Sequence, residues 1–270
     1  MRPIEITDPT DPRIAKFVDV RKARSASNRG SASSTFIAEG HLVVGRLIES
    51  DYKVQSLLVQ QGSQIPCNDK LPSDVSVFTL PSEMIDQVVG FDFHRGVLAC
   101  GERQAITPSS KFSVKKAVGR VGLVLLGITE QENMGSILRT AAALGIQDIC
   151  LGPGTIDPLS RRVIRVSMAT VFKHRFFRID DPAEQLREWS KQDIRTIAST
   201  LQDDSMPIAD LRRDNRPTLL IIGNEATGID LSVQNLTTDR VRIPMANGVD
   251  SLNAAVAAAI LMYELTSAKD

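Results

Sequence analysis

The chain has 270 residues, of which 42% are hydrophobic and 24% are charged, and its 32 basic and 32 acidic side chains balance to a net charge of zero. These values are ordinary for a soluble globular protein of one or two domains. They exclude a strongly basic protein, so any contact with nucleic acid depends on local basic patches.

The N-terminus and the cysteines indicate the cellular compartment of the protein. No apolar segment follows the positive charge near Met1, so no secretory signal is expected, and no run reaches the roughly 18 apolar residues of a membrane span. The cysteines, Cys67, Cys100 and Cys150, are isolated, odd in number and without metal-ligand spacing. That pattern favours buried free thiols over a redox or zinc site. We therefore expect a cytoplasmic protein without membrane contact.

Two stretches are locally basic. The first is rich in Ser, Gly and Asn and carries Arg21, Lys22, Arg24 and Arg29. The second contains Arg161, Arg162, Arg165, Lys173, Arg175 and Arg178. Either could contact phosphate groups, and a solvated charged face is the alternative for each.

The first part of the chain, residues 1–105, is predicted to be a small α/β domain. Apolar residues recur at intervals of three and four over 36–50, which predicts a helix. Short β-branched and apolar runs predict strands at 56–59, 75–80 and 96–100. Residues 106–117 mix Pro, Ser and charge without periodicity, which predicts a linker.

Strands and helices alternate over residues 118–270, which predicts a parallel, doubly wound sheet. The expected helices are 133–144 and 251–264, and the expected strands are 122–127, 149–151, 194–198, 219–222 and 241–243. The last helix is apolar on every side. Such a helix is buried, either within the monomer or in a subunit interface.

Two glycine-marked turns, at 222–228 and 243–253, each follow a strand-like run, and the second opens a helix. Both should therefore lie at the carboxyl ends of parallel strands, where open α/β sheets bind ligands. The sequence contains no dinucleotide fingerprint, no P-loop and no nucleophile elbow. His41, His94 and His174 are far apart and form no metal-spaced cluster.

A third segment, residues 133–145, reads Asn-Met-Gly-Ser-Ile-Leu-Arg-Thr-Ala-Ala-Ala-Leu-Gly and precedes the two glycine turns. Together these segments resemble motifs 1, 2 and 3 of the SpoU/TrmH family of RNA ribose 2′-O-methyltransferases, in the family's order. Residues 36–40 and 159–168 also resemble family segments. Departures from the family pattern, such as Ala169 in place of Gly, flank the site and bear on substrate choice.

The resemblance implies a deep trefoil knot in a methyltransferase domain over 118–270, preceded by a ribosomal-protein L30-like (L30e-like) domain that helps to choose the RNA. It also implies a homodimer formed through the C-terminal helices. The implied reaction is methyl transfer from S-adenosylmethionine to a ribose 2′-hydroxyl of rRNA or tRNA, with rRNA favoured by the N-terminal domain. A non-catalytic RNA-binding protein that retains the knotted domain is the alternative.

The resemblance also implies the site residues. Donor contacts fall on Gly223, Ile243 and Leu252, with Thr200, Asn224, Gly228 and Met245 nearby. Glycine permits close approach of the backbone to a ligand. The acceptor side falls on Arg139, Asn133, Glu225, Ser251 and Asn253, and the reaction requires no metal.

Some of these residues have alternative interpretations. Asn133 and Ser251 are also good helix N-caps. Arg139 either holds the RNA phosphate and hydroxyl or acts as a general base, and its apolar neighbours suggest a charge that needs a partner or ligand.

Overall fold

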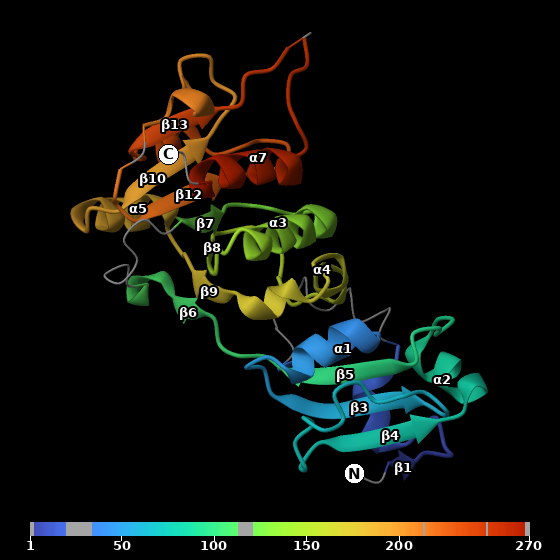
Figure 1. The fold of residues 1–270 in the computed structure, drawn as a ribbon. Helices are drawn as coiled ribbons and strands as arrows, with labels where there is room; N and C mark the ends of the chain where they lie inside the picture. The colour runs from blue at the N-terminus through green and yellow to red at the C-terminus, as the bar shows by residue number, and fades with distance from the viewer. Residues whose placement is uncertain (1–2, 20–33, 113–120, 213, 247, 268–270) are drawn as a thin grey trace. The chain divides into compact units, whose positions relative to one another are not determined.

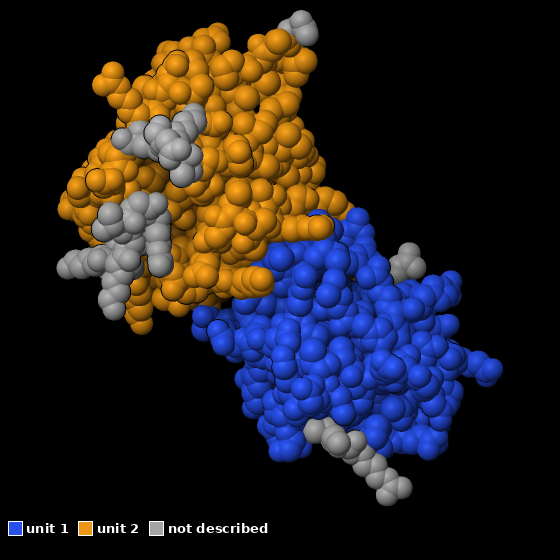
Figure 2. Space-filling view, viewed as in Figure 1, with its two compact units in different colours: residues 1–105, 158–172 blue, residues 106–157, 173–270 orange. Residues whose placement is uncertain are grey.

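A computed structural model describes residues 3–19, 34–112, 121–212, 214–246 and 248–267. The basic residues between 21 and 29 lie outside these ranges. The chain forms two compact units, one of residues 1–105 with 158–172 and one of residues 106–157 with 173–270, which are coloured separately in Figure 2. No helix in the described ranges is long and apolar enough to cross a membrane.

The first unit is built on a five-stranded mixed sheet with the order β1-β4-β3-β5-β2. Strand β5 is antiparallel to β2 and β3, whereas β4 is parallel to β1 and β3. The bounds are β1 Ile4–Glu5, β2 Thr35–Glu39, α1 His41–Ile48, β3 Val54–Gln60, β4 Ser76–Leu80, α2 Ser82–Val89, β5 Val97–Glu102 and α4 Arg161–Val166, with a 3₁₀ helix at Pro12–Phe17. The core of the sheet includes Phe17, Leu58, Leu80 and Leu98.

The expected helix at 36–50 is wrong over its first residues. Thr35–Glu39 form strand β2, which pairs with β5, and only His41–Ile48 are helical. Gly40 separates the two elements with a φ of 92°, a backbone conformation that residues with a side chain rarely adopt. Pairing with β5 therefore overrides the helical periodicity of this segment.

Residues 158–172 differ from the expected domain plan, because they belong to the first unit. Helix α4 packs against β2. The ring of Phe172 lies 5.6 Å from that of Phe36 and 5.4 Å from that of Tyr52. Aromatic packing and an ion pair between Arg161 and Glu39 hold the segment there.

The second unit contains an eight-stranded sheet with the order β11-β13-β10-β12-β7-β8-β9-β6, in which all paired neighbours are parallel. Helices α3 and α7 pack together on one side of the sheet, and α5 lies on the other (Figure 1). The strand bounds are β6 Thr107–Pro108, β7 Val121–Leu125, β8 Asp148–Leu151, β9 Arg175–Arg178, β10 Arg195–Ser199, β11 Met206–Pro207, β12 Thr218–Ile222 and β13 Asp239–Arg242. The helix bounds are α3 Gln131–Ala143, α5 Pro182–Lys191, α6 Leu231–Gln234 and α7 Ala254–Thr266, with 3₁₀ turns at Ser109–Lys111 and Ile208–Asp210. A further 3₁₀ turn, Thr170–Lys173, lies where the chain passes from the first unit into the second.

The expected linker does not stay irregular. Thr107–Pro108 pair with β9, and Ser109–Lys111 form a 3₁₀ turn, so this stretch joins the second unit. Residues 113–117 of the expected linker lie outside the described ranges. The five strands predicted in this half are all present, and the parallel α/β class is confirmed.

The order of the strands decides which loops meet. Strand β10 lies between β12 and β13, with Ala198 opposite Ile221 and Ser199 opposite Val241. The loops after these three strands begin with Thr200, Gly223 and Ile243. Since parallel strands end at the same edge, three segments spread over more than forty residues start side by side.

Candidate functional site

A chain of hydrogen bonds joins the three motifs at this edge of the sheet. Asn133 donates from Nδ2 to Glu225 Oε1 at 3.1 Å, and Asn253 donates from Nδ2 to Asn133 Oδ1 at 2.8 Å. Glu225 also accepts from the backbone N–H groups of Thr129 and Glu130, at 3.2 and 3.1 Å. The site therefore has a connected polar centre.

Asn133 and Ser251 do not serve as helix N-caps. Helix α3 starts at Gln131 after Glu130, so Asn133 lies in its first turn, where it is 4% exposed. The N-cap of α7 is Asn253, whose Oδ1 accepts from the N–H groups of Ala255 and Val256. Ser251 is exposed before the helix and stays outside the hydrogen-bond network. Asn253 thus both starts α7 and reaches Asn133.

The carboxyl group of Glu225 is held as a carboxylate. Partial burial by itself raises its pKa, but the hydrogen bonds from Asn133 and from the backbone of 129–130 outweigh that effect and lower the pKa below its usual value. A carboxylate that accepts several N–H bonds is a fixed anchor for the loops that donate them. Glu225 therefore orients the motif 1 turn.

Gly223 and Gly228 are needed for different reasons. A Cβ on Gly223 would lie 2.4 Å from the backbone carbon of Gly228, whereas a Cβ on Gly228 would meet nothing within 4 Å. Gly228 instead has a φ of 68°. Asn224 closes the turn through two backbone bonds with Gly228, and its side chain donates to the carbonyl of Gly127 at 2.7 Å. These three residues shape the loop.

The segments after β10, β12 and β13, where the sequence predicts the donor contacts, start at the same edge of the sheet. Thr200 is buried, and its backbone N–H donates to the carbonyl of Val241. Ile243, Met245 and Leu252 are apolar and half-buried. Backbone edges beside partly exposed apolar side chains fit the ribose and adenine of S-adenosylmethionine, which carry polar edges and flat apolar faces.

Arg139 is not part of the hydrogen-bonded centre. Its side chain is exposed on α3, and within the described ranges it makes no hydrogen bond or ion pair. The apolar residues around it in the sequence, such as Ile137, Leu138 and Ala141, face the core instead. No described side chain pairs with Arg139, so the partner or ligand expected for this charge would be the RNA substrate or a second subunit.

Sequence reasoning missed the residues that support these contacts. Gly127 follows β7 with a φ of 69° and accepts the Asn224 bond, while its N–H donates to Thr155 Oγ1 at 2.9 Å. Thr129 and Glu130 supply N–H groups to Glu225. The glycine at the end of an apolar strand is the signal that could have pointed to this turn.

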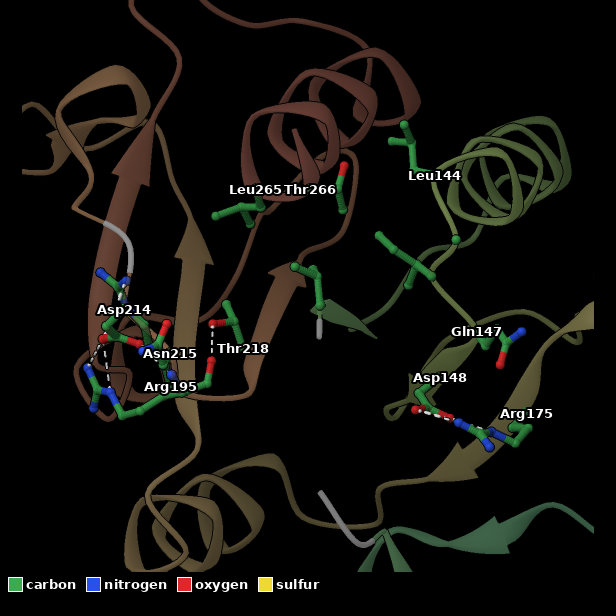
Figure 3. Close-up of a pocket in the computed structure, with 14 residues that line it drawn as sticks. Leu144, Gln147, Asp148, Arg175, Arg195, Asp214, Asn215, Thr218, Leu265 and Thr266 are labelled. Atoms are coloured by element: carbon green, nitrogen blue, oxygen red, sulfur yellow. Dashed lines mark hydrogen bonds and ion pairs between the residues drawn. The ribbon is translucent and has the colours of Figure 1, made fainter. Parts of the chain in front are cut away.

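A pocket of about 520 Å³ lies at the opposite edge of the sheet. Its lining includes Asp148, Arg175, Arg195 and Thr218, which start strands β8, β9, β10 and β12 (Figure 3). Charged side chains line it and form ion pairs with one another, such as Arg175–Asp148 at 2.7 Å. Ligands of open α/β sheets bind at the carboxyl ends, so this cavity is separate from the candidate site.

The cysteines and histidines lie apart from the site network. Cys100 and Cys150 are buried free thiols, as expected, whereas Cys67 is only half-buried. Burial raises the pKa of both buried thiols. His174 is buried and bonds the carbonyl of Leu138 at 2.9 Å, and burial lowers its pKa. Among the described residues no group of His, Cys, Asp and Glu is arranged to hold a metal ion.

The chain is similar to proteins of one known family. The model of the SpoU rRNA methylase family matches residues 120–263. An uncharacterized tRNA/rRNA methyltransferase of Mycobacterium bovis is 32% identical over 97% of this chain and 91% of its own length. The 23S rRNA (guanosine(2553)-2′-O)-methyltransferase RlmP of Bacillus subtilis is 26% identical over 93% of this chain and 95% of its own.

The same likeness holds in three dimensions. The crystal structure of an AdoMet-bound rRNA methyltransferase from Sinorhizobium meliloti superimposes with a TM-score of 0.80 at 25% identity, covering 97% of each chain. The family model spans the whole of the candidate site, from motif 1 to helix α7. The chain therefore belongs to the SpoU rRNA methylase family.

Proposed function

We propose that this RNA methyltransferase transfers the methyl group of S-adenosylmethionine to a ribose 2′-hydroxyl of structured RNA, and that ribosomal RNA is its substrate. The observation that carries the proposal is the bonded network of Glu225, Asn133 and Asn253, which joins all three motifs at the carboxyl edge of the sheet. Relatives named as 23S rRNA 2′-O-methyltransferases support the ribose and the rRNA.

On the donor side, the segments after β10, β12 and β13 would hold S-adenosylmethionine. Thr200 and Gly223 present backbone groups, and Ile243, Met245 and Leu252 present apolar surface. When bound, the sulfonium supplies an electrophilic methyl group. Asn224 and Gly228 keep the loop between them closed in a fixed shape, so the donor would meet a prearranged surface.

On the acceptor side, the enzyme must align a weakly acidic hydroxyl with the methyl group. A guanidinium in water stays protonated and binds phosphate through a planar fork. Exposed Arg139 is therefore suited to holding the RNA phosphate and hydroxyl, and less suited to accepting a proton. Glu225 and Asn133 hold the turn at the start of the helix that carries Arg139, and Ser251 is exposed and able to donate to RNA.

A homodimer is part of the proposal. Helix α7 buries Ala258, Leu261 and Met262, but Val256 and Tyr263 remain 49% and 60% exposed in the monomer. An apolar face of this kind favours cover by a second subunit. Of the two interpretations of α7, burial within the monomer accounts for only one side.

The remaining features follow from family membership. We expect the C-terminal unit to carry the trefoil knot, and the first unit to be an L30-like domain that helps to select RNA. We also expect the enzyme to work in the cytoplasm.

The test is incubation of the purified protein with tritiated S-adenosylmethionine and separated tRNA and rRNA, followed by nuclease digestion and nucleoside analysis. Label in 2′-O-methylated nucleosides of rRNA is the expected result, and label only in tRNA would overturn the choice of RNA. Donor binding without label in either pool would favour a non-catalytic RNA-binding protein.

A further inference from the structure

A pocket of about 380 Å³ lies within the first unit. It lies beside the start of α1, and its lining includes Arg95 and Arg165. The segment 158–172 contributes Arg165 and Met168, so the pocket exists only because that segment packs on the first unit.

One carboxylate lines the pocket, that of Glu39, and it is already paired with two arginines. Glu39 is 5% exposed; its Oε2 accepts from Arg161 Nη2 at 2.6 Å, and its Oε1 lies 3.3 Å from Arg95 Nε. Arg161 is fixed further by Phe91, since its guanidinium carbon lies 4.3 Å from the ring centre. Both oxygens of Glu39 are thus engaged by other arginines.

Arg165 remains without a fixed partner. Within the described ranges it makes no hydrogen bond or ion pair. Partial burial lowers its pKa, and so do Arg162, Arg95 and Arg161, whereas Glu39 alone opposes them. An anion placed beside Arg165 would relieve this repulsion among like charges.

The backbone around the pocket also favours an anion. Helix α1 begins at His41 after Gly40, which has no side chain to cap it, and the first residues of the helix line the pocket. Free N–H groups at a helix start attract negative charge. On the other side, Met168 and Ala169 hold left-handed φ values of 53° and 62°, and Arg46 donates to the Met168 carbonyl. Non-glycine residues in this conformation occur often at ligand sites.

We propose that this pocket binds a backbone phosphate of the RNA substrate, with Arg165 as the charged contact and the start of α1 as the second donor. The inference rests on RNA being the substrate, as proposed above, and names where the first unit holds it. An acidic peptide would need a longer basic groove, whereas one phosphate suits a compact pocket with one available guanidinium.

The test is RNA binding by the full chain, measured by fluorescence anisotropy with labelled fragments of ribosomal RNA over a series of salt concentrations. Arg165→Gln is expected to weaken binding about tenfold and to reduce the slope of log affinity against log salt by about one. The matched control is Arg187→Gln, which removes an exposed arginine of α5 that lacks an ion pair within the described ranges. Wild-type affinity and slope in Arg165→Gln would overturn the proposal.

Arg165→Lys guards against misfolding, because it keeps the charge. It is expected to bind RNA within about threefold of wild type. A loss as large as that of Arg165→Gln would overturn the phosphate contact, since the side chain would then matter for its shape in the fold. Inorganic phosphate is the second probe, and it is expected to compete with RNA for the wild type but only weakly for Arg165→Gln.

Methylation of the same RNA is followed in parallel, so that the two proposals can fail separately. Methylation by both proteins with unchanged RNA affinity would remove the phosphate site and leave the reaction standing. Weaker RNA binding by Arg165→Gln, with no methylation by either protein, would support the site and remove the reaction.

Discussion

At the scale of single residues, the most informative contrast is between Asn133 and Arg139, which share helix α3. Asn133 is buried and bonded to both Glu225 and Asn253, whereas Arg139 is exposed and unbonded within the described ranges. Six residues of helix separate them by about 9 Å along the axis. Asn133 therefore supports the structure of the site, whereas Arg139 is available to contact a substrate.

Arg139→Ala is expected to abolish methyl transfer while leaving donor binding and folding intact. The exposed side chain supports no packing, so its loss should change the free energy of unfolding by less than about 0.5 kcal/mol. Calorimetric titration with S-adenosylmethionine and the tritium assay measure the two effects. Arg187→Ala, at an exposed position of α5, is the control, and normal turnover by Arg139→Ala would remove Arg139 from the mechanism.

Glu225→Gln is expected to flatten the acid side of the stability curve. The pKa of Glu225 is lowered in the folded state, so its contribution is present above the unfolded value of 4.5 and is lost as the pH falls through the lower folded value. Urea unfolding between about pH 3 and pH 7 measures this. If the free energy of unfolding falls equally in acid for Glu225→Gln and wild type, the hydrogen bonds from Asn133 and residues 129–130 do not stabilise a carboxylate at Glu225.

At the scale of elements, the motif 2 turn shows that two glycines of one loop serve different needs. Gly223 leaves room for the backbone of Gly228, whereas Gly228 itself adopts a left-handed φ in open space. The sequence pattern alone predicts only that both glycines form a turn. Only the packed loop separates a steric need from a conformational one.

The two glycines can be compared by substitution. Gly223→Ala is expected to destabilise the protein by about 2 to 3 kcal/mol, because the backbone of Gly228 must move, and to weaken donor binding. Gly228→Ala is expected to cost about 1 kcal/mol, the strain of a left-handed alanine. Urea unfolding measures both. Equal costs would contradict the steric role of Gly223.

At the scale of the whole molecule, helix α7 connects the fold to the homodimer proposed above. Ile260→Glu places a charge in the exposed stripe formed with Val256 and Tyr263. It is expected to convert a dimer to a monomer in size-exclusion chromatography with light scattering and to lower turnover at least tenfold, since a charge in an apolar interface lacks a partner. Leu231→Glu, at an exposed position of α6, is the control; a dimeric Ile260→Glu would contradict the interface.

The first unit combines residues 1–105 with the distant segment 158–172, and Glu39 links the two through its ion pair with Arg161. Glu39→Gln leaves Arg161 without its buried carboxylate, and is expected to cost about 3 kcal/mol of stability. Hydrogen exchange over residues 158–172 should become faster. Glu188→Gln, which breaks an exposed pair with Lys191, is the control and should cost less than about 1 kcal/mol. Unchanged exchange would show that aromatic packing suffices.

The sequence by itself determined the parallel α/β class, five of the eight strands of the second unit and the family, because apolar runs and glycine turns are local patterns with fixed spacing. Only the tertiary structure decided which residues contact one another. Asn133 bonds partners 92 and 120 residues away, Asn253 replaces Ser251 as the cap of α7, and Arg139 turns out to be exposed. The segment 158–172 joins the first unit, and 35–39 form a strand. Strand order and packing select these contacts, and neither is encoded in the spacing of neighbouring residues.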